Sequence, residues 1–145
     1  PPAPDETPGV GGLPAFHRLP SVGALLYCCT GPLPMIDLSH LMHLFRGDRA
    51  QVREWIGLYL QEAPTYFDEL FASSRSGDAR TMANASHDLQ AQAHYLGAPR
   101  MLELLIAIEE QAVARGADSC GELLNTLLPL REGIDRELRA VLNAS

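Results

Sequence analysis

The sequence predicts an all-α protein: an up-down antiparallel four-helix bundle with a short additional N-terminal helix that covers one end. Three observations favour this fold. After residue 35, apolar residues recur at helical spacing in four long segments, alternating strand patterns are lacking, and the connections are only a few residues long. The 145 residues suffice for one core, and the length gives no reason to expect two.

The chain divides at about residue 35. Eight of its eleven prolines precede this point, together with several glycines, so we expect a Pro/Gly-rich linker over 1–35 and the helical bundle over 36–145. Residues 21–29 are unusually apolar for a linker. Docking on the bundle, docking on a neighbouring domain and a buried strand all remain open for them. The lack of an initiator methionine and of a signal-peptide pattern indicates a piece of a longer protein.

Two helices are expected first. Asp37 can cap a short helix that runs through about Phe45 and is ended by Gly47, and Asp48 can cap a long helix to about Ser74. Pro64 falls inside the long helix and should kink it or open one hydrogen bond. Its apolar positions supply part of the core: Val52, Trp55, Ile56, Tyr59, Leu60, Phe67, Leu70 and Phe71.

The third helix is expected to begin after Asp78 and to end at Gly97. The fourth runs from about Pro99, where a first-turn proline is tolerated, to Arg115, since Gly116 follows.

A capping-box pattern, Ser119 with Glu122, marks the start of the fifth helix. Pro129 is expected to interrupt this helix. Its contribution to the core is predicted to come from Leu123, Leu127, Leu130, Ile134, Leu138 and Leu142.

One histidine of the third helix is placed where it adds nothing to a core. At about 100° per residue, one apolar stripe is formed by Met82, Ala85, Leu89, Ala93 and Leu96. His87 lies about 160–200° from that stripe, so we expect it to point into solvent from mid-helix. Its value would then be chemical, because imidazole is nucleophilic.

The side chains next to His87 on the predicted helix leave its imidazole accessible to a partner protein. Ala83 and Ala91, one turn before and one turn after, leave the imidazole clear. The next ring of side chains is polar and mostly able to donate hydrogen bonds: Arg80, Asn84, Gln90 and His94. Such a ring suits a transient anion, for instance a phosphoryl group. The alternative is a solvated helix face that happens to contain a histidine.

The remaining histidines of the helical region are interpreted as structural or solvent-exposed. His94 shares a face with His87; a second phosphorylation site is the alternative to an exposed polar residue, which we favour. No metal site is expected, because structural zinc needs four ligands and these two histidines do not supply a set. His40 and His43 are interpreted as cap or packing residues.

The stretch from Ser86 to Ala98 resembles the signature of histidine-containing phosphotransfer (HPt) domains. That signature reads His-x-Leu-Lys-Gly-Ser, with Leu-Gly-Ala closing the helix. The residues in register are His87, Leu89, Leu96, Gly97 and Ala98, and the similarity extends over roughly 36–142. Three positions depart from the pattern: Gln90 replaces lysine, Ala91 glycine and Gln92 serine. Arg80 could restore some positive charge, but it lies two turns from His87, about 10 Å along the axis.

The resemblance implies a phosphocarrier rather than an enzyme. His87 would accept a phosphoryl group from a receiver-domain aspartate and pass it to another receiver. The receiver, not this chain, would bring Mg²⁺, so no cofactor is expected here. Apolar residues beside the His87 face, such as Leu41 and Leu44, would form the docking surface. The domain would be the C-terminal module of a bacterial hybrid sensor kinase. The alternative is a degenerate module that binds receivers without efficient transfer.

Composition excludes other classes of function. A net charge of −7 makes nucleic acid a poor partner. No ATP-binding motif is present, and no apolar run approaches the roughly 20 residues needed to span a bilayer. Three cysteines, two of them adjacent, do not resemble a secreted disulfide framework. We therefore expect a cytoplasmic location, with tethering to the inner membrane only through a parent kinase.

Overall fold

The computed structural model describes residues 35–144, and every regular element in this range is a helix. In chain order these are α2 (Ser39–Leu44), α3 (Arg49–Ser76), α4 (Ala79–Tyr95), α5 (Pro99–Arg115), the 3-10 helix η2 (Ala117–Cys120) and α6 (Gly121–Asn143). The predicted all-α class is confirmed. Between residues 35 and 144, no helix is long and apolar enough to cross a membrane. All but the last residue of the predicted linker, including its apolar run over 21–29, lies outside the described residues.

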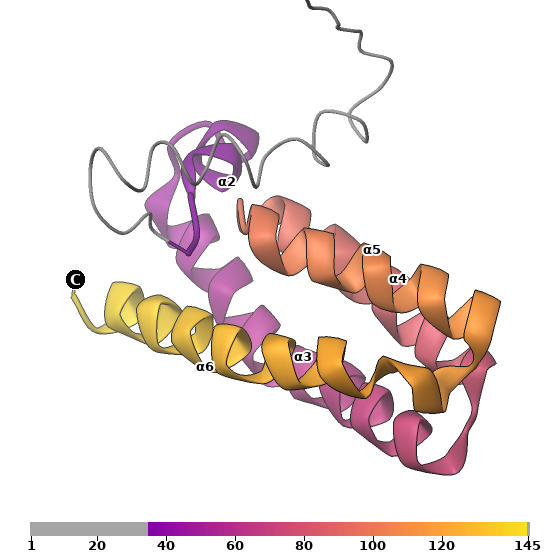
Figure 1. The fold of residues 1–145 in the computed structure, drawn as a ribbon. Coiled ribbons are helices and arrows are strands. Elements are labelled where there is room, and N and C mark those ends of the chain that lie inside the picture. The colour runs from indigo at the N-terminus through magenta and orange to yellow at the C-terminus, as the bar shows by residue number, and fades with distance from the viewer. Residues whose placement is uncertain (1–34, 145) are drawn as a thin grey trace, which may run out of the picture. The chain divides into compact units, whose positions relative to one another are not determined.

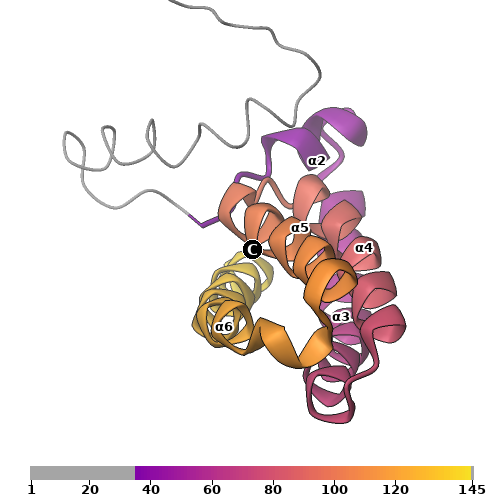
Figure 2. The ribbon, with the colours of Figure 1, turned by 45° about the vertical axis from the view of Figure 1, so that its right-hand side comes forward.

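The four long helices pack together around one core (Figure 1). α4 contacts α3 and α5, and α6 also contacts α3 and α5. In the turned view of Figure 2, α6 lies on one side of the group and α4 on the other. Each long helix contributes fully buried side chains to the shared core: Ile56, Phe67, Leu70, Met82, Leu89, Leu105, Ile108, Leu127 and Ile134.

Side-chain caps begin two of the long helices as predicted. The carboxylate of Asp48 accepts a hydrogen bond from the Gln51 amide at 3.2 Å, and that of Asp78 accepts one from the Thr81 amide at 3.0 Å. Each cap satisfies one of the amides that a helix start leaves without an intrahelical partner. α3 continues through Pro64 to Ser76, so the proline does not divide it.

The start of α6 differs from the prediction. The capping box is wrong: Cys120 is the N-cap, without a side-chain hydrogen bond. The Ser119 hydroxyl instead donates to the Gly116 carbonyl at 2.7 Å. Pro129 does not interrupt α6, which is one helix over its whole length. The residues that α6 contributes to the core also differ from the prediction. Leu124 is buried, whereas Leu123, Leu130 and Leu142 are only half-buried.

A backbone contact fixes the segment before α2 against the C-terminal end of α4. The Asp37 amide donates to the Leu96 carbonyl at 3.0 Å. The next residue, Gly97, has a φ of 63°, and a Cβ added there would collide with the Asp37 carbonyl. Glycine at 97 is therefore required by both conformation and space.

The predicted cap of the first helix is placed differently. The carboxylate of Asp37 accepts a hydrogen bond from the Ser39 amide at 3.0 Å, although Leu38 rather than Asp37 is the N-cap of α2.

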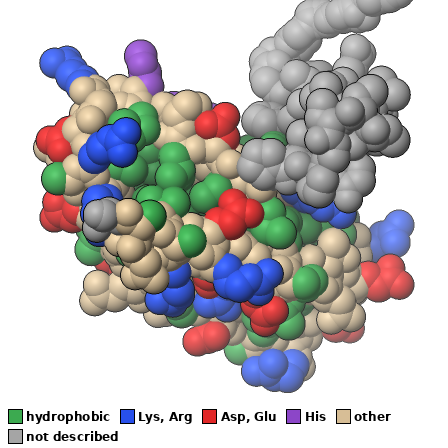
Figure 3. Space-filling view, turned by 90° about the vertical axis from the view of Figure 1, so that its left-hand side faces the viewer, with side chains coloured by type: hydrophobic (Ala, Val, Ile, Leu, Met, Phe, Trp, Pro, Cys, Tyr) green, Lys and Arg blue, Asp and Glu red, His purple; other side chains and the backbone are tan. Residues whose placement is uncertain are grey.

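The beginning of α3 and the end of α6 are joined by an arginine. The guanidinium of Arg53 donates to the carbonyls of Val141 and Leu142, at 3.2 and 2.7 Å. A cation is favourable there, because the last carbonyls of a helix carry partial negative charge. Figure 3 views the molecule from this side, where hydrophobic side chains gather among basic and acidic ones.

Candidate functional site

His87 stands on the outer face of α4, near the middle of the helix. Its side chain is 71% exposed, whereas the opposite stripe is buried throughout: Met82, Ala85, Leu89, Ala93 and Leu96. The predicted exposure of His87 is confirmed. Ser86, directly before it, is fully buried, so the change from core to solvent occurs within one residue. A rigid helix thus presents the imidazole where another protein can approach.

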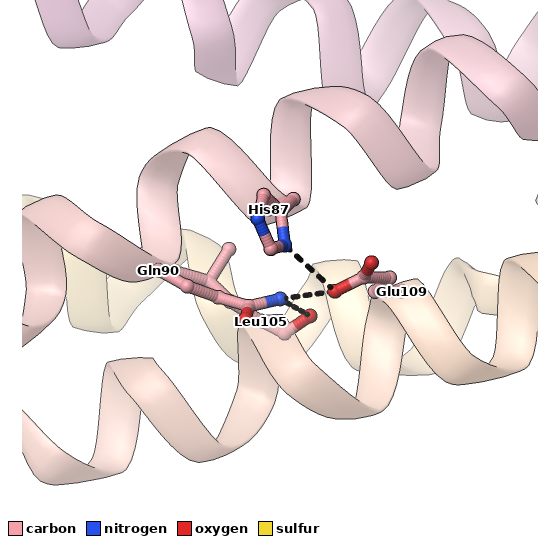
Figure 4. A network of polar contacts seen from close by, with 4 residues as sticks. All are labelled: His87, Gln90, Leu105 and Glu109. Carbon is pink, nitrogen blue, oxygen red and sulfur yellow. Dashed lines mark hydrogen bonds and ion pairs between the residues drawn. The ribbon is translucent and has the colours of Figure 1, made fainter.

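A carboxylate from the neighbouring helix faces the imidazole. Oε1 of Glu109, on α5, lies 3.6 Å from Nδ1 of His87 (Figure 4). This distance is longer than a hydrogen bond, so the contact is electrostatic. The negative charge of the carboxylate favours the N–H of the neutral imidazole on the nitrogen that faces it, Nδ1. Nε2, on the far side of the ring, is then the nitrogen with a free lone pair and can act as nucleophile.

Gln90 is turned toward the same carboxylate rather than toward solvent. Its Nε2 donates to Oε1 of Glu109 at 2.6 Å and lies 3.5 Å from the Leu105 carbonyl oxygen (Figure 4). One oxygen of Glu109 therefore faces both His87 and Gln90. Gln90 holds the carboxylate in place, which is a positioning role that the sequence did not indicate.

Sequence reasoning missed Glu109. The residue sits on α5, one turn after the buried Leu105, and its side chain is 33% exposed. Its place at the edge of the apolar stripe of α5 was the only available signal. Which residue of α5 meets His87 depends on the register between two helices, and sequence periodicity does not contain that register.

The other residues predicted around His87 lie on the same helix as expected, but with different exposures. Ala91 and Asn84 are exposed, and Ala83 is half-buried. Arg80 is exposed two turns away. No described contact joins any of these four side chains to the imidazole. Ala83 and Ala91 each place only a methyl group on this face of α4.

His94 is brought to α2 rather than to His87. Its ring lies 4.9 Å from that of His40 and 5.9 Å from that of Tyr95, measured between centroids. Leu41 cannot belong to a docking surface, which corrects the expectation, because it is fully buried in the core. Leu44 is 50% exposed and is available.

The part of the chain that the structure describes has no three-ligand metal cluster, and its one cysteine is buried. Residues 35–144 contain no group of three or more His, Cys, Asp or Glu side chains able to hold a metal ion. Cys120 is buried against the core, with Sγ 3.7 Å from the Ile108 carbonyl oxygen, and burial raises the pKa of its thiol. A raised pKa lowers the thiolate fraction that nucleophilic chemistry requires.

Comparison with known proteins identifies the family. The model of the Hpt domain matches residues 54–144, a range that contains His87, Gln90 and Glu109 and more than half of the chain. No curated protein and no solved structure matches this sequence. With an exposed histidine on the third of the five α-helices within residues 35–144 and a family match over most of the bundle, the chain belongs to the Hpt domain family.

Proposed function

We propose that His87 is the phosphoryl-carrying residue of this domain. Hpt domains are phosphocarrier modules that transfer phosphoryl groups on histidine in phosphorelays and interact with receiver domains of response regulators. The observation that carries the assignment is the geometry of His87: 71% exposed, with Nδ1 facing Glu109. Of the histidines in residues 35–144, it alone lies within 4 Å of a carboxylate oxygen.

The transfer step follows from this geometry. Nε2 of His87 attacks the phosphorus of a receiver's aspartyl phosphate. The N–P bond forms as the P–O bond to the aspartate breaks, and the aspartate leaves as a carboxylate. The imidazole becomes a cation that keeps its proton on Nδ1, opposite Glu109. Transfer to a second receiver reverses these changes, and the receiver supplies the Mg²⁺ that neutralises the moving group.

Gln90 supports this step through Glu109 rather than through the phosphoryl group. Its amide already donates to the carboxylate at 2.6 Å, so it is not free to replace the lysine of the family pattern. The positive charge near the phosphoryl group must then come from the receiver. We infer a domain that depends strongly on its docked partner for transfer.

Three further proposals concern the helix order, the cellular location and the parent protein. We propose an up-down antiparallel order for the four long helices, a cytoplasmic location, and a place as a module of a hybrid sensor kinase. The short connections between helices support the first of these. The odd number of cysteines supports the second.

Phosphotransfer from purified receivers tests the proposal. The chain is incubated with each of a panel of phosphorylated receivers from the same organism, and acid-labile, base-stable label on the chain is measured. We expect label on the wild type and on the matched control His94→Gln, and none on His87→Gln. Label retained by His87→Gln would exclude His87 as the carrier. No label from any receiver would contradict phosphotransfer and favour a domain that only binds.

A further inference from the structure

Two histidines from different helices meet beside the C-terminal end of α4. The rings of His40, on α2, and His94, on α4, have centroids 4.9 Å apart and planes at 63°. Both residues are exposed. His40 also stacks on Tyr95, with centroids 5.8 Å apart and planes at 26°. The spacing of the pair depends on how α2, which contacts α3, is held beside the C-terminal end of α4, and not on position along one helix.

A metal ion shared by two histidine rings fits this spacing. Histidine nitrogen binds Zn²⁺ at about 2.0–2.1 Å, which places the ring centroid about 3.2 Å from the ion, and two such rings at a tetrahedral angle have centroids about 5 Å apart. The observed separation is 4.9 Å. Imidazole is a preferred ligand of zinc, copper and nickel. The net charge of −7 also favours binding of a cation.

We propose that His40 and His94 together bind one divalent transition-metal ion of the zinc class. No third His, Cys, Asp or Glu completes the set within residues 35–144, so water fills the other coordination positions. The site is therefore open and weaker than a four-ligand structural zinc site. It is also separate from His87, since His94 lies two helical turns further along α4, about 10 Å along the axis.

The bound ion would link α2 to α4. α2 has only six residues, which is too short for a helix to be stable in isolation. Its position depends on contacts with the bundle, such as the hydrogen bond from Asp37 to the Leu96 carbonyl. A ligand that binds only the folded arrangement raises the unfolding temperature. Metal binding at this pair should therefore stabilise the protein.

Calorimetric titration of the full chain with Zn²⁺ alone, together with thermal unfolding, tests the proposal. We expect one ion per chain and a higher unfolding temperature that a chelator reverses. His40→Ala and His94→Ala should each weaken binding at least tenfold and abolish the thermal shift. Both side chains are exposed, so the variants should fold, which circular dichroism checks.

The chain offers matched controls for this experiment. His43 lies one turn along α2 from His40 and makes no ring contact among residues 35–144. His43→Ala, His87→Gln and His17→Ala, the last outside the described residues, should bind Zn²⁺ like the wild type. Loss of binding in any of these controls would overturn the assignment to the pair. So would unchanged binding in His40→Ala or His94→Ala, a complex of two chains per ion in sedimentation, or no binding at all.

Discussion

Replacing Glu109 by glutamine removes the charge beside His87 while keeping an oxygen that can accept from Gln90. In the wild type, the carboxylate oxygen lies 3.6 Å from Nδ1 of His87. In the proposed transfer, the imidazole becomes a cation with its proton on that nitrogen. The carboxylate therefore stabilises the phosphorylated ring more than the neutral ring, and we expect slower phosphorylation when its charge is lost.

The size of the effect follows from the geometry. Two unit charges 3.6 Å apart interact by about 1.2 kcal/mol at the dielectric constant of water. That dielectric constant is appropriate because the side chains are 71% and 33% exposed, and exposed ion pairs contribute about 0.2–1 kcal/mol. The phosphoryl group on Nε2 would lie about 7 Å from the carboxylate, where its two charges are repelled by about 1 kcal/mol in water.

The attraction of Glu109 to the imidazolium and its repulsion from the phosphoryl group decide in which measurement the loss of charge is visible. In the free phosphorylated domain they nearly cancel, so the lifetime of the phosphohistidine should change little. In the proposed complex, Mg²⁺ on the receiver would neutralise the phosphoryl charge, and the attraction between Glu109 and the imidazolium would remain. A loss of about 1 kcal/mol corresponds to transfer about fivefold slower.

Rapid-quench measurement of transfer from a phosphorylated receiver checks this prediction. The matched control is Glu110→Gln, which removes the same charge from the adjacent, exposed position on α5. We expect a rate about fivefold lower for Glu109→Gln and a wild-type rate for Glu110→Gln. Equal rates for the two variants would refute the role of Glu109, because only the overall charge would then matter.

Three further predictions follow from neighbouring features. Gln90→Lys should change the transfer rate by no more than about threefold, because the ammonium group that it adds near the phosphoryl group comes with the loss of the amide that holds Glu109. A larger increase in the same rapid-quench assay would show that the missing lysine limits transfer. Gly97→Ala should lower the free energy of unfolding, measured in urea, by about 2 kcal/mol or more, because it adds left-handed strain of about 1–2 kcal/mol to a collision with the Asp37 carbonyl. Gly77 also has a positive φ, 77°, but open space around it, so Gly77→Ala should show the strain alone. An equal loss of stability in both variants would contradict the collision. Hydrogen bonds from the Thr81 hydroxyl and amide lower the pKa of Asp78 below its ordinary value of 3.8. The stability that this carboxylate contributes above pH 3.8 should therefore be lost as the pH falls through the lowered pKa. Asp78→Asn should weaken the acid sensitivity of thermal unfolding between about pH 5 and pH 2, and an unchanged pH profile would argue against the cap.

Local signals predicted the helices well. Asp48 and Asp78 cap the helices that follow them, as expected. The fourth predicted helix has the bounds of α5, Pro99–Arg115. These features are encoded within a few residues: a carboxylate that reaches the next turn, a proline where no amide donor is needed, and a glycine that leaves the helical conformation.

Prediction failed where a residue had partners other than the expected one. Ser119 has the sequence of a cap, but its hydroxyl oxygen contacts the Gly116 carbonyl and Nε2 of Gln111, at 2.7 and 3.4 Å. The contact between Glu109 and His87 was not predicted either, because it arises only when α5 packs against α4. Helical periodicity places a side chain on a face but does not say which residue of the neighbouring helix it will meet.

The proposed function requires that Nε2 of His87 carries the phosphoryl group while Nδ1 keeps its proton opposite Glu109. Nuclear magnetic resonance of the chain with ¹⁵N-labelled histidine, before and after incubation with a phosphorylated receiver, distinguishes the two ring nitrogens. We expect the signals of one histidine to change, no such change in His87→Gln, and coupling of the phosphorus to Nε2. Phosphorus bonded to Nδ1 of His87, or to another histidine such as His94, would contradict this assignment.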